Sequence, residues 1–352
     1  MDSLIPRRSP ALAGGLLALL AAALFGLSTP FVQMLGRGLG PFATAALLYA
    51  GAAAAGALLR KPAGREARLT RADAPRLVSL AFFGAVVGPV ALAWGLQRAS
   101  GAGASLMLTL EALFTAALAR VLYGESMGRR VWLAMALLLV GGTALVLDQG
   151  RLGGAQVAGL MAVLLATAAW GADNALSRGL AERDPGQVVL AKSALGASAT
   201  SLMAIAAGEP LPSPAAILGL LAVGASGYGL SLRFYLLAQR SFGAARTGSV
   251  FACAPFIGAL AALALGDRSG SWLMVAAGVL MALGVFAHLA EGHAHEHQHK
   301  DLDHEHAHDH ADAHHDHAHD EPVAGAHSHP HHHAAGRHAH PHVPDAHHQH
   351  RH

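Results

Sequence analysis

A carboxylate inside a long apolar run is the first residue of this sequence whose position suggests chemistry. Glu111 lies about eleven residues into an apolar run of about twenty-three, residues 100–122. A carboxylate at the centre of a bilayer costs roughly 2.5 to 3.5 kcal/mol on insertion scales, so it normally faces a cavity or a partner. There it can hold a proton and a cation in turn. The alternative is a structural acid that is neutral or paired with an arginine.

Other polar or reactive side chains also interrupt the apolar runs. Asp173 and Asn174 are adjacent at intermediate depth, and Ser28 occupies the matching place earlier in the chain. Cys253, the single cysteine, falls where Glu111 recurs in the repeat described below. We expect these residues to form one intramembrane polar site with Glu111. A purely structural role for Asp173 is an equal alternative.

Histidine is confined to the end of the chain. All 25 histidines lie at or after His288, and 24 of them fall in residues 291–352. The first H-x-H runs contain His293, His295, His297, His299, His304, His306, His308 and His310. Imidazoles with carboxylates between them suit Zn, Ni, Co and Cu, so we expect weak binding of such metals and no required cofactor. With few large apolar residues this tail cannot bury a core, and we expect it to be disordered.

The composition predicts that most of the chain is an all-α integral membrane protein. The residues are 53% hydrophobic and 13% charged, and the mean hydropathy is +0.39; about a quarter of the residues are charged in an ordinary soluble domain. A helix needs about 20 apolar residues to cross a bilayer, and we predict ten such spans. They are residues 11–35, 40–59, 77–97, 100–122, 128–148, 155–180, 186–207, 214–237, 242–265 and 271–290.

An internal repeat divides the membrane part into two halves. Residues 97–126 recur as residues 239–268, with ten of thirty positions identical. This spacing is far longer than the period of about 20 to 50 residues of a solenoid, so it indicates a duplicated half-protein. The predicted parts are a cytoplasmic segment at 1–10, the two halves at 11–150 and 151–290, and the tail at 291–352.

The distribution of basic residues predicts the orientation. If the N-terminus is cytoplasmic, 17 Lys and Arg lie on or near that side, against four on the other: Arg37, Arg98, Arg151 and Arg268. The positive-inside rule therefore predicts that both termini are cytoplasmic. Because each half has five spans, an odd number, the second half must be inverted relative to the first, a common plan of secondary transporters.

Four basic residues inside the predicted spans need a separate explanation. They are Arg178, Lys192, Arg233 and Arg246. Each lies within about 6 residues of a cytoplasmic helix end, roughly 9 Å at 1.5 Å per residue. Their long side chains can reach the interface, so we interpret them as anchors.

The fourth predicted span carries a recognisable pattern. It reads A-S-L-x-x-x-L-E-A-L-F-x-A-x-L-A-x-x-x-x-G-E over residues 104–125, and its repeat contains Ala-Pro-Phe at residues 254–256. With the two five-helix halves, residues 11–290 resemble the EamA branch of the drug/metabolite transporter superfamily. In that family Pro usually follows the Glu, but Ala112 follows Glu111 here. A helix break is therefore expected near Pro255 in the second half more than at Glu111.

The resemblance implies ten transmembrane helices, a central cavity and export of small metabolites, often amino acids or drugs. It implies a multi-pass protein of the bacterial inner (plasma) membrane, in contact with the lipid bilayer, and it is compatible with a homodimer. Neither a phosphate loop nor a nucleophile motif points to an enzyme, and topology explains the basic residues without a nucleic-acid partner.

Three functions fit these features. We favour a secondary transporter that exports a divalent transition metal (Ni, Co or Zn) by alternating access, with the tail as cytoplasmic collector, because it explains the tail and the spans together. The alternative is an exporter of amino acids, other metabolites or drugs whose tail only buffers or senses metal. A membrane-tethered metal store is weaker, because ten spans exceed what an anchor needs.

Overall fold

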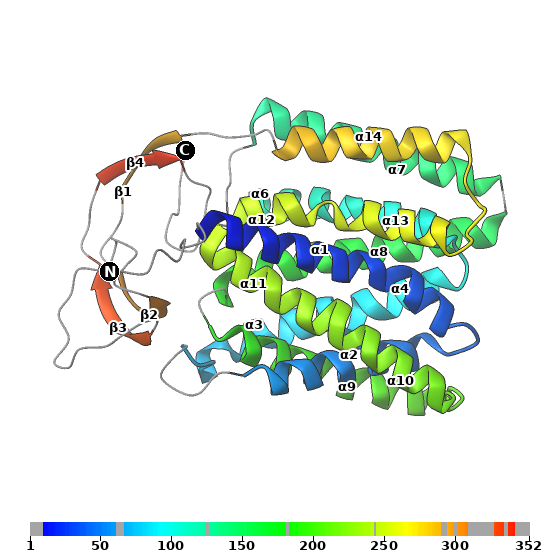
Figure 1. The fold of residues 1–352 in the computed structure, drawn as a ribbon, viewed down its shortest axis with the longest axis horizontal. Coiled ribbons are helices and arrows are strands. Elements are labelled where there is room, and N and C mark those ends of the chain that lie inside the picture. The colour runs from blue at the N-terminus through cyan, green and yellow to red at the C-terminus, as the bar shows by residue number, and fades with distance from the viewer. Residues whose placement is uncertain are drawn as a thin grey trace, which may run out of the picture.

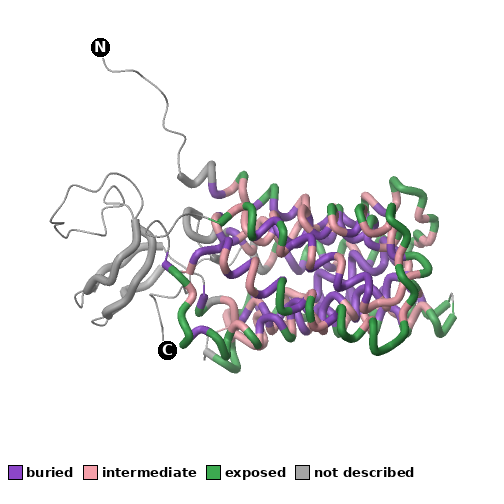
Figure 2. Tube along the Cα trace, turned by 90° about the horizontal axis from the view of Figure 1, so that it is seen from below, coloured by how far each residue is buried: buried purple, intermediate pink, exposed green. Residues whose placement is uncertain are grey.

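The helices of the protein form one bundle whose axes run roughly parallel (Figure 1). The computed structural model describes residues 10–60, 67–123, 127–151, 153–180, 183–242 and 244–289, and tail strands at 294–298, 302–308, 327–333 and 337–341. Buried residues follow the length of the bundle and exposed ones lie on its flanks and ends (Figure 2).

The helices of the first half follow the first five predicted spans. They are α1 (Pro10–Leu35), α2 (Pro41–Leu58), η1 (Arg71–Asp73), α3 (Ala74–Leu80), η2 (Ala81–Val87), α4 (Gly88–Leu96), α5 (Gly101–Met107), η3 (Leu108–Leu110), α6 (Glu111–Tyr123) and α7 (Arg129–Gly150). Local sequence sets several of the starts. α2 begins at a proline, whose missing N–H costs nothing at that position, and Ser100 caps α5 by accepting from the Gly103 N–H at 3.0 Å.

The helices of the second half repeat this order. They are α8 (Gly154–Ser177), η4 (Arg178–Leu180), α9 (Pro185–Ala206), α10 (Pro214–Val223), η5 (Gly224–Leu230), α11 (Ser231–Phe242), α12 (Ala244–Phe251), α13 (Ala254–Ala264) and α14 (Trp272–Leu289). α9 and α10 each begin at a proline, preceded by the capping residues Asp184 and Ser213. Cap side chains accept from N–H groups that have no partner within the helix, which fixes where these helices start.

Eight helical segments of the described residues are long and apolar enough to cross a membrane. They are Gly14–Leu35, Pro41–Leu58, Arg71–Leu96, Gly101–Leu122, Arg129–Gly150, Gly154–Ser177, Pro185–Ala206 and Pro214–Ala238. The ninth predicted span is divided into α12 and α13, and the tenth is α14; their apolar parts, Ala254–Ala264 and Trp272–Ala287, are shorter. The helical, multi-pass membrane fold is thus confirmed, and the count of ten spans stays a prediction.

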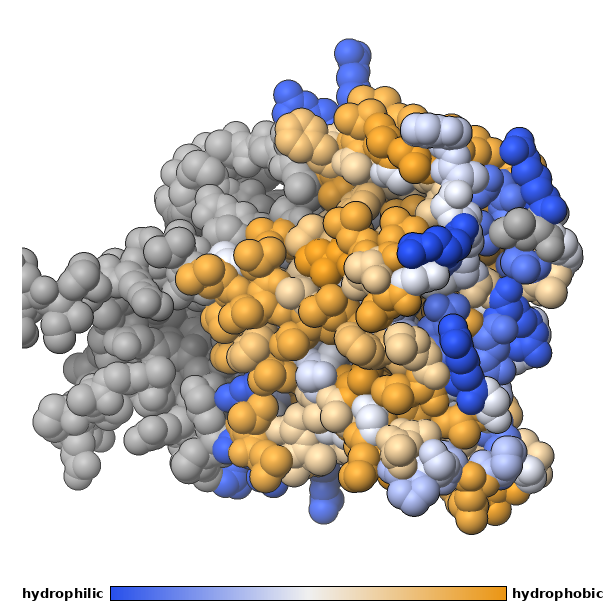
Figure 3. All heavy atoms as spheres, turned by 45° about the vertical axis from the view of Figure 1, so that its right-hand side comes forward, coloured by the Kyte–Doolittle hydropathy of each residue, from blue (hydrophilic) through white to orange (hydrophobic). Residues whose placement is uncertain are grey.

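Large apolar side chains cover the flanks of the bundle. Leu139, Leu165, Leu202 and Leu218 are all more than half exposed. Figure 3 shows hydrophobic residues across the flank and hydrophilic residues gathered towards one end. An apolar surface of this extent marks a membrane or interaction surface, and the hydrocarbon of a bilayer would cover it.

Helices that belong to equivalent spans of the two halves pack against each other. α2 packs on α9, α5 on α13 and α7 on α14. The α2–α9 pair is antiparallel: the Ala43 N–H at the start of α2 donates to Glu209, just after α9, at 2.7 Å, and Gly56 near the end of α2 lies against Leu190 near the start of α9. Antiparallel packing of equivalent helices is the arrangement that an inverted repeat produces.

The structure describes four short strands of the tail, and the expected disorder of the tail stays a prediction. β1 (Ala294–Gln298) pairs antiparallel with β4 (Arg337–Pro341), and β2 (Leu302–His308) with β3 (His327–His333). Alternating H-x-H sequence has the period of two that a strand needs, and backbone pairing needs no apolar core. A two-stranded pair without an apolar face is only marginally stable in water.

Candidate functional site

Four predicted spans lose regular α-helical geometry at positions that the repeat relates. The π-helices η2 and η5 lie 143 residues apart in the third and eighth spans. The 3-10 turn η3 directly precedes Glu111, and Cys253, 142 residues later, lies in the turn between α12 and α13. Irregular backbone inside a membrane is tolerated only beside protein or a polar cavity, and π-bulges are frequent at functional sites. These positions are therefore the first candidates for a functional site.

The carbonyl of Gly84 in η2 accepts hydrogen bonds from two aromatic side chains. In this π-helix the Gly88 N–H donates to the Phe83 carbonyl, five residues back. The Gly84 carbonyl would next accept from residue 89, but Pro89 has no N–H. The Tyr49 hydroxyl and the Trp170 indole, at 3.0 Å, donate to it instead. Pro89 thus explains why helices of both halves place polar aromatic groups here.

An aromatic cluster surrounds this point. The rings of Phe25 and Trp170 meet edge to face at 5.6 Å, and Tyr228 lies 5.8 Å from Phe25 and 5.6 Å from Tyr49. Phe25 and Trp170 are 145 residues apart and are repeat equivalents. The two halves therefore meet through aromatic rings beside the irregular helices.

Asp173 and Lys192 form a buried ion pair between α8 and α9. Their side chains contact through Asp173 Oδ2 and Lys192 Nζ, and the residues are only 6% and 5% exposed. Gly84 lies directly opposite, and a methyl group there would come within 3.0 Å of the Asp173 carboxylate. Lys192 is therefore not the interfacial anchor that we predicted: its side chain points into the bundle because a carboxylate there compensates its charge.

Glu111 lies next to this pair. Asn174 Nδ2 donates to Glu111 Oε1 at 2.5 Å, joining α8 to the start of α6. Because Asp173 and Asn174 are neighbours in α8, one helix links the ion pair to Glu111. The partner of Glu111 is thus an amide, and three of the predicted site residues lie together.

A narrow pocket reaches the ion pair. It is lined by Leu80, Asp173, Asn174, Ser177, Leu180, Val188, Lys192, Leu232, Tyr235 and Leu236. Its volume of about 20 Å³ is room for about one water molecule. Oδ1 of Asp173 is buried and has no hydrogen-bond partner among the described residues. A buried carboxylate oxygen without a partner is costly, so this atom can accept from a ligand or water in the pocket.

Ser28 and Cys253 have other neighbours. The Ser28 hydroxyl donates to the Phe25 carbonyl at 2.6 Å, and its side chain lies against Gly227 of η5. Cys253 is a half-buried free thiol, and its carbonyl accepts from the N–H groups of Phe256 and Ile257 at 3.1 Å. The structure does not bring these two residues into the Glu111–Asp173 group.

The predicted metal ligands lie in the tail, apart from the intramembrane carboxylates and Cys253. Within the described part of the chain, no group of three or more His, Cys, Asp or Glu could hold a metal ion. Among the predicted tail ligands, His293, His299 and His310 lie outside the described residues. The others lie in strands whose side chains are not described: His295, His297, His304, His306 and His308. Their metal binding stays a prediction.

Sequence reasoning missed Lys192 and the donors to Gly84. A signal for Lys192 was present: it and Asp173 are opposite charges inside consecutive apolar runs, where each needs a partner. Tyr49 and Trp170 gave no such signal, because aromatic residues are ordinary in spans and the Gly84 carbonyl becomes an acceptor only through the π-helix.

This arrangement, an apolar helical bundle of two inverted halves with buried charges beside irregular helices, defines a class of membrane transport proteins. The chain belongs to the EamA-like transporter family, whose model matches residues 12–147 and again residues 157–289. The family is one of transporters and not of enzymes.

Two individual comparisons agree with this class. An uncharacterized transporter of Methanothermobacter thermautotrophicus is 27% identical over 227 residues, which span 63% of this chain and 66% of that protein. A solved crystal structure, described only as that of a protein, matches with a TM-score of 0.54 and 21% identity, over 80% of this chain and 96% of the other. The second likeness concerns the fold alone.

Proposed function

We propose that the protein is a secondary transporter that exports a small polar organic solute across the plasma membrane by alternating access. The observation that carries this proposal is the buried Asp173–Lys192 pair, with an unpartnered Asp173 oxygen beside a pocket. Burying two ions costs several kcal/mol each before their attraction compensates. Ionisable groups inside membranes commonly mark substrate or ion pathways, and a transport site is a sufficient reason to retain this pair.

The pair can exchange its partners for those of a solute. A solute carboxylate would replace Asp173 on Lys192, and a solute N–H or O–H group would be accepted by Asp173 Oδ1. The aromatic rings of Tyr49, Trp170 and Tyr228 would contact the apolar part of the solute. This chemistry favours a metabolite or drug-like solute over a divalent metal, because Lys192 already neutralises Asp173 and would repel a second cation.

Glu111 supplies the coupling step of the proposed mechanism. As a carboxylate it accepts from Asn174, and a proton from outside would change that hydrogen bond and the charge beside the ion pair. The two halves would then rock relative to each other and expose the site to one side and then the other. The orientation with cytoplasmic termini and the direction of export belong to this proposal; they rest on the 17-to-four distribution of basic residues and on the family resemblance.

Transport in proteoliposomes tests the coupling role of Glu111. Counterflow with a panel of amino acids, organic acids and Ni²⁺ would identify a substrate, and a pH gradient would then drive its movement. We expect Glu111→Gln to abolish pH-driven transport while the protein stays folded. Glu209→Gln is the matched control, because Glu209 caps α2 away from the site. If Glu111→Gln transports at the normal rate with the normal pH dependence, Glu111 is structural.

The metal exporter remains a second candidate because of the 24 histidines in residues 291–352. Under this proposal the tail collects Ni, Co or Zn in the cytoplasm and raises its concentration near the pore. Ni²⁺ transport by the full chain and by a chain ending at residue 290 would then differ at low metal concentration. Binding should weaken below about pH 6, because protonated imidazole cannot ligate a metal. An absence of Ni²⁺ transport by both chains would exclude this candidate.

A further inference from the structure

A second pocket lies at the other end of the bundle from the Asp173–Lys192 pair. It has a volume of about 320 Å³, and its polar lining includes Gln33, Arg37, Arg98, Gln149, Gln156 and Ser269. We call it the outer vestibule. Gln156 at the start of α8 lines it, and Asp173 is 17 residues further along the same helix, roughly 25 Å at 1.5 Å per residue. The two pockets are therefore distinct.

The outer vestibule carries positive charge at a fixed position. The Arg98 guanidinium stacks on the Trp94 ring at 3.7 Å, and its Nη1 donates to the Trp94 carbonyl at 3.0 Å. Arg37 is a second basic residue of the lining, and none of the lining residues is acidic. A guanidinium held by an aromatic face presents its remaining N–H groups in a planar fork that suits carboxylate and phosphate oxygens.

Two carboxylates that lie within two residues of the lining, Asp148 and Asp267, already have hydrogen-bond donors. Asp267 accepts from the Ala102 N–H at 2.9 Å and from the Ser269 hydroxyl at 2.6 Å. Partial burial opposes ionisation of Asp267, but these hydrogen bonds outweigh it and hold its pKa below the ordinary value. Asp148 accepts from the Ser271 hydroxyl at 2.6 Å. These contacts join helix ends. Because both carboxylates have other partners, they leave the arginines available to a ligand in the vestibule.

A buried acceptor also lines the vestibule. Gln149 is fully buried, and its Oε1 has no hydrogen-bond partner among the described residues. Gln33 is held nearby, because its Nε2 donates to the carbonyls of Leu96 and Ala99 at 3.0 Å. A ligand that fits both features has an anionic oxygen group for the arginines and an O–H or N–H donor for Gln149.

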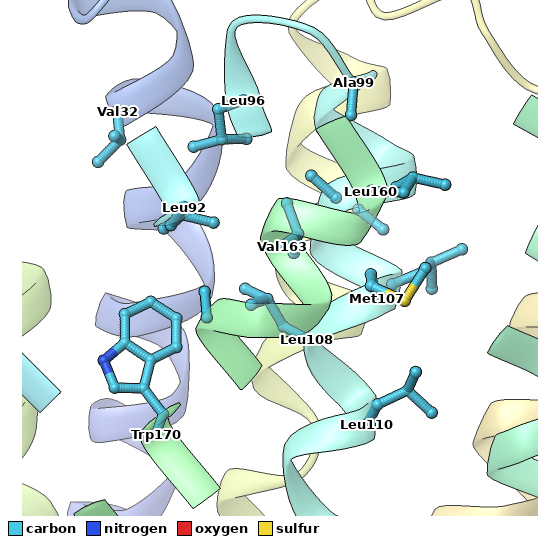
Figure 4. Close-up of a cluster of buried hydrophobic side chains, with 14 of the residues drawn as sticks. Val32, Leu92, Leu96, Ala99, Met107, Leu108, Leu110, Leu160, Val163 and Trp170 are labelled. Carbon is cyan, nitrogen blue, oxygen red and sulfur yellow. The ribbon is translucent and has the colours of Figure 1, made fainter. Parts of the chain in front are cut away.

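Apolar side chains separate the vestibule from the inner site. Leu96 and Ala99 line the vestibule and are buried. Figure 4 shows Val32 and Leu92 beneath Leu96, with Trp170 beyond them. Val32 and Leu92 are 1% and 0% exposed, so a ligand in the vestibule cannot reach Asp173 without rearrangement of the helices.

We infer that the outer vestibule is a binding site for a small anion that also carries a hydrogen-bond donor, such as a hydroxycarboxylate. It would hold the transported solute after release from the inner site, and this assignment to transport rests on the proposed function. Lipid phosphate groups share the anionic chemistry, since the vestibule lies at the end of the bundle that our orientation places at the outer leaflet.

Binding of lactate to the full-length protein in neutral detergent tests the inference, with lactamide as the uncharged control. We expect lactate to bind, lactamide not to bind, and lactate affinity to fall about tenfold in Arg98→Gln and in Arg37→Gln, because each loses a charge-assisted hydrogen bond. Arg151→Gln is the matched control: it removes the same charge at the same end but Arg151 does not line the pocket. Size-exclusion profiles would show that the variants are folded.

Two outcomes would overturn the inference: lactamide binding as tightly as lactate, or unchanged affinity in both vestibule variants. The proposed function would survive either, provided that Glu111→Gln still abolishes transport. Nanodiscs distinguish the two anion sources. If phosphatidylglycerol lowers lactate affinity relative to phosphatidylcholine, and this effect is lost in Arg98→Gln, the vestibule binds the headgroup of an anionic lipid. If lipid composition has no effect, it binds the free carboxylate.

Discussion

The two halves of the chain have different residues at equivalent positions. These positions are buried and mainly apolar in the first half, and they are polar or charged in the second half. In the first half Ser28, Val32 and Leu48 are at most 3% exposed, and Val32 and Leu48 belong to the main hydrophobic core. Their equivalents, 145 residues on for the first two and 144 for the third, are Asp173, Ser177 and Lys192. All three line the narrow pocket at the Asp173–Lys192 pair.

This comparison shows that equivalent positions of a duplicated framework differ in polarity. The repeat supplies matching π-helices and antiparallel packing, so the same helix positions occur in both halves. At these positions the second half has two charged residues and a serine, and the first half has a serine and two buried apolar residues. Val32 of the first half lies between the outer vestibule and the Asp173–Lys192 pair, and the residues of the second half line the narrow pocket at that pair.

The largest effect is expected when one partner of the ion pair is removed. Lys192→Met leaves the Asp173 charge buried without compensation, which costs about 3 to 5 kcal/mol. The double variant Asp173→Ser/Lys192→Leu copies Ser28 and Leu48 of the first half, and we expect it to recover most of the stability but no transport. Thermal unfolding in detergent and proteoliposome counterflow measure both. Equal stability of the single and double variants would contradict a buried ion pair.

A smaller effect is expected for the glycines that face these side chains. A methyl group at Gly84 would collide with the Asp173 carboxylate, and one at Gly227 would lie 2.5 Å from the Ser28 side chain. Overpacking of this kind costs about 1 to 3 kcal/mol. We expect both alanine variants to be destabilised but only Gly84→Ala to lose transport.

Gly248→Ala in α12 is the matched control for the two glycine variants. The nearest atom to its added methyl group would be the Tyr235 hydroxyl at 3.9 Å. It should therefore be as stable as the unmodified protein, or more stable by up to about 1 kcal/mol through helix propensity. Equal loss of transport in Gly84→Ala and Gly227→Ala would show that the two halves contribute alike.

A moderate loss of stability is expected when a polar residue replaces Val32, one of the apolar side chains between the outer vestibule and the Asp173–Lys192 pair. Val32→Ser gives the first half the residue that the second half has at Ser177, at a cost of about 2 kcal/mol for the lost apolar contact and the buried hydroxyl. The test uses Ser28→Cys in a Cys253→Ala background and measures its rate of reaction with an impermeant maleimide added from outside. This rate should be higher when Val32→Ser is also present. An unchanged rate would mean that residues other than Val32 block access to position 28.

The smallest effect is expected at Asp267 between α13 and α14. Because its folded pKa is lowered by the hydrogen bonds described above, its ionised form stabilises the protein above the unfolded pKa of about 4. That contribution is lost as the pH falls through the lower folded value. Asp267→Asn should be less stable by a few tenths of a kcal/mol at pH 7, given its partial exposure. The difference should vanish in acid, as a pH series of melting temperatures would show.

The hydropathy pattern was enough to predict where most of the helices lie. The predicted apolar runs agree with the helices to within a few residues at most ends, because bilayer-length apolar segments have to satisfy their own backbone hydrogen bonds. The repeat and the odd number of spans indicated the inversion. The pattern also pointed to Glu111, Asp173 and Asn174, since a polar group inside an apolar run needs a partner.

The pairing of side chains could not be predicted from the sequence and follows from helix packing. It paired Lys192 with Asp173 and Asn174 with Glu111, and it left Ser28 and Cys253 with other neighbours. It also turned the Gly84 carbonyl into an acceptor, through Pro89 and the π-helix. Side-chain pairing depends on the rotation of each helix about its axis and on the distance between helices. Packing between the halves sets both quantities, and the hydropathy of a single segment does not.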